Sequence, residues 1–417
     1  MPRREVVVTG LGLLSPLGDS AEALHEALLA GESGVRPVEL FDTSLLTTRI
    51  GGEIRPFEPE CYLGERNLRP LDRTSRLLIS AAGRALEDAG WTEEARGGLH
   101  GRELSLAVGT TYCSMHTIGE FDRRGLKLGP NYVSPFDFAN SVINAAAGQA
   151  AIWHKLSGVN STLAGGEASG LQAIAYGADL IRTGQADVVL AGGVEELCFE
   201  SSIAYSRAGR LCGGEVGSES NGRPVPFDRG RDGFAPGEGA GLLVLEAAEV
   251  AEERGAKIRA RIAGSGAAFA PERKGDFATG LSRAIRSAWT SRVAGSGPLL
   301  CVSSGASGAR DLDAWEAEGI ARGLEAVGAS GASVTAIKAN LGEALGASGA
   351  FQAISLISSL SDGRLPGIAG LDRTDDGFPL SGVSASSRAF APVPGAWALA
   401  TAICADGPVM ALLLAAP

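Results

Sequence analysis

Short apolar runs alternate along this chain with alanine-rich stretches of helical periodicity, and glycines separate the two kinds of segment. The strand-like runs lie at residues 5–9, 105–109, 186–192 and 241–245, and the helical stretches lie at 20–30, 75–89 and 167–183. A β/α order with short connections favours a parallel or mixed sheet that is covered by helices. The chain is therefore expected to adopt an α/β fold.

The size and the glycine content of the chain fit this expectation. Its 417 residues are 45% hydrophobic and 20% charged, which is enough apolar material for a large core in one or two globular domains. Its 59 glycines occur singly or in pairs at the ends of apolar runs rather than in a low-complexity tract. They predict tight turns between strands and helices.

Charge, hydropathy and cysteine spacing argue against several classes of protein. The net charge of −11 argues against nucleic acid or an anionic membrane surface as a partner. No apolar run reaches the roughly 20 residues of a membrane span, and residues 1–5 lead into a strand without the apolar segment of a signal peptide. The six cysteines lie far apart without a C-x-x-C pair. We therefore expect a soluble cytoplasmic protein without a disulfide framework, a metal site or a cofactor.

A domain boundary is predicted near residues 250–258. Residues 246–255 have the pattern of a helix that ends in glycine, and a new apolar strand begins at Ile258. The chain would then consist of an N-terminal half, residues 1–250, and a C-terminal half, residues 251–417. Direct comparison of the two halves reveals no convincing internal repeat.

Three groups of motifs resemble those of a known family. They are VVVTGLG at 6–12 with SPLG at 15–18, VSPF at 133–136 followed by NAAAG at 144–148, and RP at 223–224 followed by FD at 227–228, RDGF at 231–234 and GEGAG at 237–241. Over nearly the whole chain they resemble the β-ketoacyl synthases of fatty-acid and polyketide assembly. The resemblance implies a thiolase-like, five-layer αβαβα fold built from two similar halves, each with a five-stranded sheet, which dimerises through the N-terminal half.

Three positions depart from what the resemblance implies for a condensing enzyme. Residues 158–171 match the family's strand-turn-helix around the catalytic cysteine without a gap, and they put Glu167 in the cysteine's place. The two family histidines are replaced by Gly305 and Glu343, whereas the motif lysine is kept as Lys338. The loop at 403–412 also lacks the phenylalanines and the final asparagine of the family's pocket loop.

These replacements predict that the chain has no catalytic residues for condensation. Glu167 would be a poor nucleophile, and its simplest role at the start of a helix is to complement the dipole, worth about 0.3–1 kcal/mol. Gly305 offers no donor to a thioester oxygen, and an ionised Glu343 would repel an enolate. Substitutes are scarce, because the chain has four histidines, of which three are most simply surface or structural residues: His25, His100 and His154.

Glu167, Lys338 and Glu343 are expected to meet in the vestigial site. A lysine between two carboxylates would form a buried ionic cluster that fills and closes this site, and leaving one member unpaired would cost about 3–5 kcal/mol. Glu316 is a second possible partner for Lys338.

Catalytically silent members of the family are known as chain-length factors. The resemblance implies that such a chain forms a heterodimer with an active ketosynthase subunit and limits the length of the polyketide or polyene that grows on an acyl carrier protein. Many of these factors have glutamine, a close isostere of Glu167, in the cysteine's place. Two alternatives stay open: an acyltransferase or decarboxylase that uses the glutamate pair, and a scaffold that stabilises a partner without shaping its product.

The resemblance also implies a tunnel along the dimer interface, whose depth is limited by residues after a strand-end glycine. The matching segment here is residues 109–119. If it begins helically, Tyr112, Met115 and Gly119 share one face. We predict that Tyr112 is the main plug, Met115 an adaptable wall and Gly119 the open end, with His116 on the neighbouring face. Ordinary interface packing by Tyr112 and Met115 is the open alternative. Three apolar residues are expected to face the partner: Val142, Ile143 and Trp153.

Overall fold

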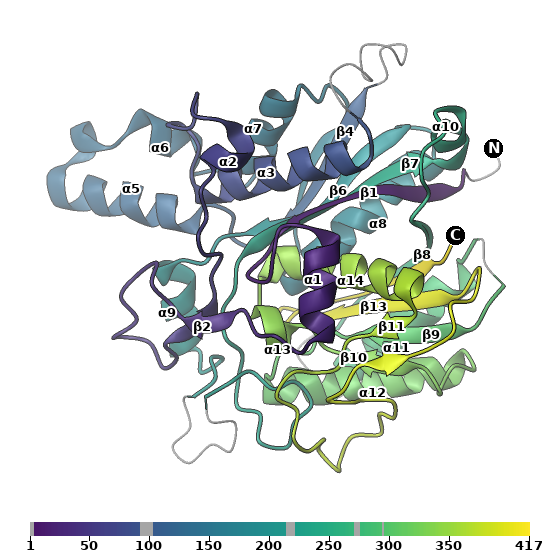
Figure 1. The fold of residues 1–417 in the computed structure, drawn as a ribbon. Coiled ribbons are helices and arrows are strands. Elements are labelled where there is room, and N and C mark those ends of the chain that lie inside the picture. The colour runs from purple at the N-terminus through teal and green to yellow at the C-terminus, as the bar shows by residue number, and fades with distance from the viewer. Residues whose placement is uncertain (1–3, 92–102, 214–221, 271–275, 294–295) are drawn as a thin grey trace.

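The computed structural model describes residues 4–91, 103–213, 222–270, 276–293 and 296–417, and it shows a layered α/β molecule (Figure 1). Ten strands form one hydrogen-bonded ladder. In the first part of the chain these are β1 (Val6–Leu14), β4 (Leu104–Thr110), β5 (Asn160–Ala164), β6 (Val188–Glu195) and β7 (Gly239–Ala247). In the second part they are β8 (Ala260–Phe269), β9 (Leu299–Ser303), β10 (Ser333–Thr335), β13 (Trp397–Ile403) and β14 (Pro408–Ala415).

The two halves of the ladder have the same topology. The order is β5-β4-β6-β7-β1 in the first half and β10-β9-β13-β14-β8 in the second. In each half the outermost pairs are parallel and the pairs nearest the junction are antiparallel. The construction from two similar halves is therefore confirmed, although sequence comparison of the halves did not detect it.

The resemblance implied a five-stranded sheet in each half, but hydrogen bonds join the strands of both halves into one sheet. Strands β1 and β8 pair over two positions, Val7 with Arg261 and Val8 with Ala260. This short pairing joins the edge strand of one half to the edge strand of the other, so that hydrogen bonding continues through all ten strands.

Helices form three layers around the two halves of the sheet (Figure 1). The central layer contains α8 (Ser169–Arg182) and α14 (Ser348–Asp362), which contact strands of both halves and each other. One outer layer contains α3 (Arg73–Asp88) and α7 (Ala145–His154), and the other contains α11 (Asp276–Thr290) and α12 (Arg310–Ala326). Because α14 is covered on both sides, nearly all of its residues are buried.

Short elements complete the fold. The helices are α1 (Ala21–Leu29), α2 (Glu60–Leu63), α5 (Met115–Leu128), α6 (Pro135–Ala139), α9 (Phe199–Arg207), α10 (Ala248–Glu253) and α13 (Lys338–Leu341). The 3-10 turns are η1 (Pro130–Tyr132), η2 (Gly166–Ala168) and η3 (Leu345–Ala347). Two small ladders pair β2 (Val35–Pro37) with β3 (Ile50–Gly52) and β11 (Arg364–Leu365) with β12 (Arg388–Ala389). Among the described residues, no helix combines the length and the apolar character needed to cross a bilayer.

The expected elements correspond closely to the observed ones. The predicted strand-like runs overlap β1, β4, β6 and β7. The predicted helical stretches contain α1 and α8, and the stretch at 75–89 overlaps α3, which begins two residues earlier. The helix expected at 246–255 is shorter and corresponds to α10. Ser20 and Asp72 begin α1 and α3 by accepting hydrogen bonds from backbone N–H groups three residues on, as expected of N-cap residues.

We expect Gly12→Ala to destabilise the protein, because β1 and α3 approach too closely at this point for a side chain. A Cβ at residue 12 would lie closer than 3.0 Å to the backbone of Ala81 and Ala85. Overpacking of this kind costs about 1–3 kcal/mol. Gly148→Ala in α7 is the matched control, because its Cβ would meet open space and alanine favours a helix by about 0.5–1 kcal/mol. Urea denaturation measures both, and equal stability of the two variants would contradict this account.

Candidate functional site

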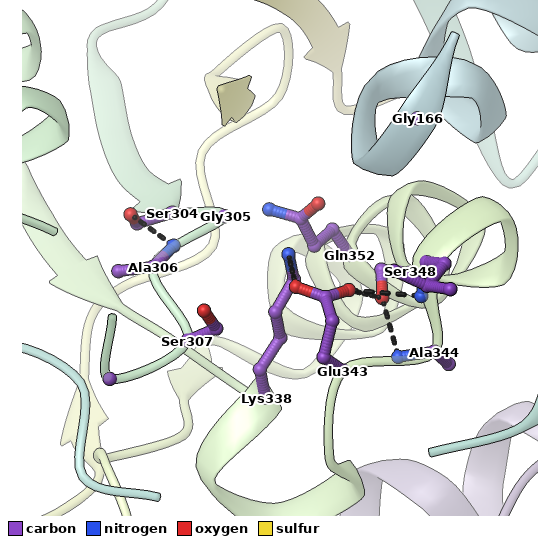
Figure 2. Close-up of polar contacts among 12 residues, drawn as sticks. Gly166, Ser304, Gly305, Ala306, Ser307, Lys338, Glu343, Ala344, Ser348 and Gln352 are labelled. Carbon is purple, nitrogen blue, oxygen red and sulfur yellow. Dashed lines mark hydrogen bonds and ion pairs between the residues drawn. The ribbon is translucent and has the colours of Figure 1, made fainter. Parts of the chain in front are cut away.

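Lys338 and Glu343 form a buried ion pair between the two halves of the molecule. Lys338 Nζ lies 2.6 Å from Glu343 Oε2, and both residues are 3% exposed (Figure 2). The other oxygen of Glu343 accepts hydrogen bonds from Ser348 Oγ at 2.8 Å and from the Leu345 backbone N–H at 2.9 Å. Burial alone would lower the pKa of Lys338, but the charges of Glu343, Glu316 and Glu167 reverse this effect and raise it. The ammonium group therefore stays charged inside the core.

Glu167 lies in η2, directly before α8, and is 8% exposed. Burial raises the pKa of its carboxyl group, and the nearby charge of Glu343 raises it further. The structure thus brings Glu167, Lys338 and Glu343 into one electrostatic cluster, with the direct ion pair formed by the last two. A buried carboxyl group whose neutral form is favoured is a poor nucleophile.

The backbone of β13 lies so close to Gly305 that it leaves no room for a side chain there. Its N–H donates a 2.7 Å hydrogen bond to Glu316 Oε1, which also accepts one from Thr401 Oγ1 at 2.6 Å. A Cβ at residue 305 would lie 2.9 Å from the Thr401 carbonyl oxygen and 3.1 Å from Ala402 Cα, both in β13. Histidine at this position would therefore require a shift of β13.

Glu316 is the second acidic neighbour of Lys338, as its sequence position had indicated. It is 1% exposed, and burial raises the pKa of its carboxyl group against the opposing effects of the Thr401 hydroxyl and Lys338. Three buried carboxyl groups, those of Glu167, Glu316 and Glu343, therefore share one lysine.

Cys404 completes the site and was not assigned a role from the sequence. It is 2% exposed in the turn between β13 and β14, and its thiol hydrogen-bonds the carboxyl group of Glu167. A Cβ on Gly166 would overlap Cys404 Sγ, so this sulfur fills the space above the start of α8. Burial, with the charge of Glu167 as the next cause, raises the pKa of the Cys404 thiol to about 12. The thiol is therefore neutral and inert at ordinary pH.

A helical start at Tyr112 was the condition for placing this residue on one face with Met115 and Gly119, and the structure does not meet it. Helix α5 begins at Met115, so the predicted shared helical face of Tyr112, Met115 and Gly119 is wrong for Tyr112. The carboxylate of Glu195, at the end of β6, accepts hydrogen bonds from the backbone N–H groups of residues 111, 112 and 113 at 2.6–2.9 Å. These bonds hold a turn, in which Cys113 has φ 55°, and they prevent an earlier start of the helix.

Gly119 and His116 face α9 of the same chain. A Cβ on Gly119 would lie 2.9 Å from Glu200 Oε1, so Gly119 lies close to this side chain. His116 Nδ1 lies 3.2 Å from Glu200 Oε2, and the His116 backbone N–H donates to Glu196 Oε1 at 2.8 Å. Met115 lies on the first turn of α5 and is partly exposed.

His116, Glu120 and Glu200 also bring possible metal-ligand atoms within 4.8 Å of one another. Arg123 already forms ion pairs with both carboxylates. The group connects α5 to α9 through these ion pairs.

The remaining histidines have structural partners where the structure describes them. His25 is buried and its Nε2 lies 2.9 Å from Asp362 Oδ2, whereas His154 Nε2 lies 2.8 Å from the Ile79 carbonyl oxygen. His100 lies outside the described residues.

We expect Lys338→Met to lower the free energy of unfolding by about 3–5 kcal/mol at pH 7, because it leaves buried carboxylates without their cation. The pKa values of Glu167 and Glu316 are raised on folding, so the folded state binds protons that the unfolded state releases above about pH 4.5. The loss should therefore be smaller at pH 5 than at pH 8. Urea denaturation at several pH values measures it.

Lys257→Met, on an exposed lysine, is the control and should change stability little. A deficit of Lys338→Met that does not depend on pH would contradict the shared-charge account.

The sequence matches both domains of one protein family. Beta-ketoacyl synthase, N-terminal domain matches residues 3–251, and Beta-ketoacyl synthase, C-terminal domain matches residues 259–372. Among curated relatives, the 3-oxoacyl-(acyl-carrier-protein) synthase 2 of Vibrio cholerae is 32% identical over 385 residues, which cover 91% of each chain. The ketoacyl synthase beta subunit of the tetracenomycin polyketide synthase of Streptomyces glaucescens is 32% identical over 371 residues, which cover 88% of each chain.

A solved structure of the ishigamide ketosynthase/chain length factor is similar over 100% of both chains, with a TM-score of 0.88 and 29% identity. The fold is accordingly the thiolase-like ketosynthase fold, and this chain belongs to the beta-ketoacyl synthase family.

Proposed function

We propose that this chain is a non-catalytic chain-length factor, which pairs with an active ketosynthase and limits the length of the polyketide or polyene that grows on an acyl carrier protein. The observation that carries the proposal is the closed cluster at the three replaced positions. Glu167, Gly305 and Glu343 each have their polar groups engaged by atoms of the chain itself. The similarity to a ketoacyl synthase beta subunit and to a ketosynthase/chain length factor supports the same assignment.

Condensation requires groups that this site does not offer. The acyl chain must be accepted by a nucleophile, and the thioester oxygen and the enolate must be stabilised by positioned donors. Burial raises the pKa of Glu167 and makes its carboxyl group a weaker nucleophile, the Cys404 thiol has a pKa of about 12, and β13 covers the space beside Gly305. The buried groups at this site therefore offer neither an activated nucleophile nor a histidine donor for condensation.

Most of the large apolar side chains that are exposed in the described part of the chain lie on or beside α5 to α8, which supports a partner there. They concentrate on α5 to α7 and on α8, and their exposed fractions lie between 37% and 88%: Leu126, Leu128, Tyr132, Phe136, Phe138, Val142, Ile143, Ile152 and Tyr176. Helices α5 and α6 project from one side of the molecule (Figure 1). A patch of this kind on one face is typical of a protein interface.

Strand β5 extends this face with a sheet edge. It is the last strand of the ladder on its side and is partly exposed. An unpaired edge strand is a ready template for pairing with another chain. Of the three residues expected to face the partner, Val142 and Ile143 are exposed, but Trp153 is half-buried against the core, and its neighbour Ile152 is exposed instead.

Tyr112 lies near the buried cluster and three residues before α5. Its side chain is half-buried, and the charge of Glu167 contributes to raising its pKa after the larger effect of burial. A bulky ring at this position would stop an acyl chain that enters from the partner's side. The length-setting role of Tyr112 is part of the proposal.

We expect Tyr112→Ala to give longer products when the chain is co-expressed with its partner ketosynthase, because removal of the ring deepens the tunnel. Mass spectrometry of the products, with gel filtration to verify that the complex is intact, measures this. Tyr132→Ala is the control, because Tyr132 lies on the same face but is 68% exposed. Unchanged products from an intact Tyr112→Ala complex would favour a scaffold that does not shape the product.

We also expect the triple variant Glu167→Cys, Gly305→His, Glu343→His to show no condensation with a partner whose own catalytic cysteine is replaced by alanine. A histidine at 305 cannot take its place without moving β13, and Cys404 still fills the space beside Gly166, next to residue 167. The measurement is release of CO₂ and formation of ketoacyl product from malonyl-loaded carrier protein. The unmodified chain in the same assay tests the alternative of an enzyme with altered chemistry, which acyl transfer or CO₂ release would support.

A further inference from the structure

The backbone on which Tyr112 sits is fixed by a single buried carboxylate. Glu195 is 1% exposed and accepts backbone N–H bonds from Thr111, Tyr112 and Cys113. It also accepts the Gly346 N–H at 3.2 Å, which ties the turn to η3 and the start of α14. Multiple backbone donors on one carboxylate give a rigid turn.

The other end of the Tyr112 side chain is fixed by Tyr205. Tyr112 Oη donates to Tyr205 Oη at 3.2 Å, and the two rings meet edge-on with centroids 6.1 Å apart. Tyr205 lies on α9 and packs edge-on against Phe234, with centroids 5.1 Å apart. Phe234 is 4% exposed, so this second ring is supported by the core.

The pair of tyrosines borders the buried cluster. Burial raises the pKa of Tyr205, and the charge of Glu167 is the next cause of this rise. Both hydroxyl groups are therefore neutral at ordinary pH and available for the bond between them. Tyr112 is held at its backbone by Glu195 and at its tip by Tyr205, which leaves it one orientation.

We propose that Tyr205 is a specificity-determining residue, which fixes the orientation of the Tyr112 ring and thereby makes the limit on acyl-chain length sharp. The inference rests on the proposed function, because it assumes that Tyr112 closes the tunnel. A plug that can turn aside admits some longer chains, whereas a plug held at both ends admits a narrow range. The group that Tyr112 keeps out is the end of the acyl chain that grows on the partner.

The test is the product distribution of Tyr205→Phe, which keeps the ring and removes the hydroxyl group. A net hydrogen bond corresponds to a population ratio of about 2- to 10-fold, so the ratio of the main product to longer products should fall by about this factor. Tyr112→Phe removes the same bond from the other side and should have the same effect. The double variant should show no further change, because both substitutions remove one interaction.

Tyr62→Phe is the control, because it removes a tyrosine hydroxyl that donates to Asp19 Oδ2 at 3.2 Å outside this segment. It should leave the distribution unchanged. Broadening by Tyr205→Phe is a readout that loss of stability alone would not produce, provided that gel filtration shows an intact complex. If Tyr205→Phe does not assemble, Tyr112→Phe still tests the bond.

The two proposals fail in different ways. If Tyr112→Ala lengthens the products while both phenylalanine variants keep a single product, the inference about Tyr205 is overturned and the chain-length role stands. If the double variant broadens the distribution by the sum of the two single effects, the residues act independently and the inference is also overturned. If Tyr112→Ala itself changes nothing, the proposed function fails first.

Discussion

The site depends on the close approach of two backbone segments. One is the turn η2 with the start of α8, and the other is the turn η3 with the start of α14. A Cβ on Gly193 or on Gly170 would overlap the carbonyl oxygen of Gly346, so only glycine lets the central helices and the sheet meet here. Because the two helix starts touch, Glu167 from one half and Glu343 from the other lie in the same electrostatic cluster. The chemistry of the site therefore follows from packing at the junction of the two halves.

The replaced positions act together. Glu343 is neutralised by Lys338 and bound by Ser348, Glu316 binds the backbone at Gly305, and the Cys404 thiol bonds Glu167. Each replacement would be costly alone, because an unpaired polar group in the core costs free energy. In combination, the carboxyl groups of Glu167, Glu316 and Glu343 each have a partner within the chain, so none of the three is left alone in the core.

The same rigidity extends towards the exposed face. Glu195 connects η3, beside the cluster, to the turn that carries Tyr112, and Tyr205 connects that side chain to the core through Phe234. Helix α5, which has exposed apolar residues, begins directly after this turn. Under the proposed function, the site would hold Tyr112 in the position where it limits the partner's acyl chain.

The sequence by itself determined the alternation of strands and helices. Through motif spacing it also predicted that Glu167, Gly305 and Glu343 are replacements and that Lys338 is retained, because the spacing of residues along a motif can be compared without coordinates. Only the tertiary structure decided that Tyr112 precedes its helix, that Ile152 rather than Trp153 is exposed, and that Cys404 and Tyr205 belong to the site. The physical reason is range. Helical periodicity reports neighbours three or four residues apart. The carboxyl group that binds the backbone at Tyr112, before the helix begins, belongs to Glu195 at the end of another strand. The sulfur beside Glu167 comes from a turn in the other half of the chain.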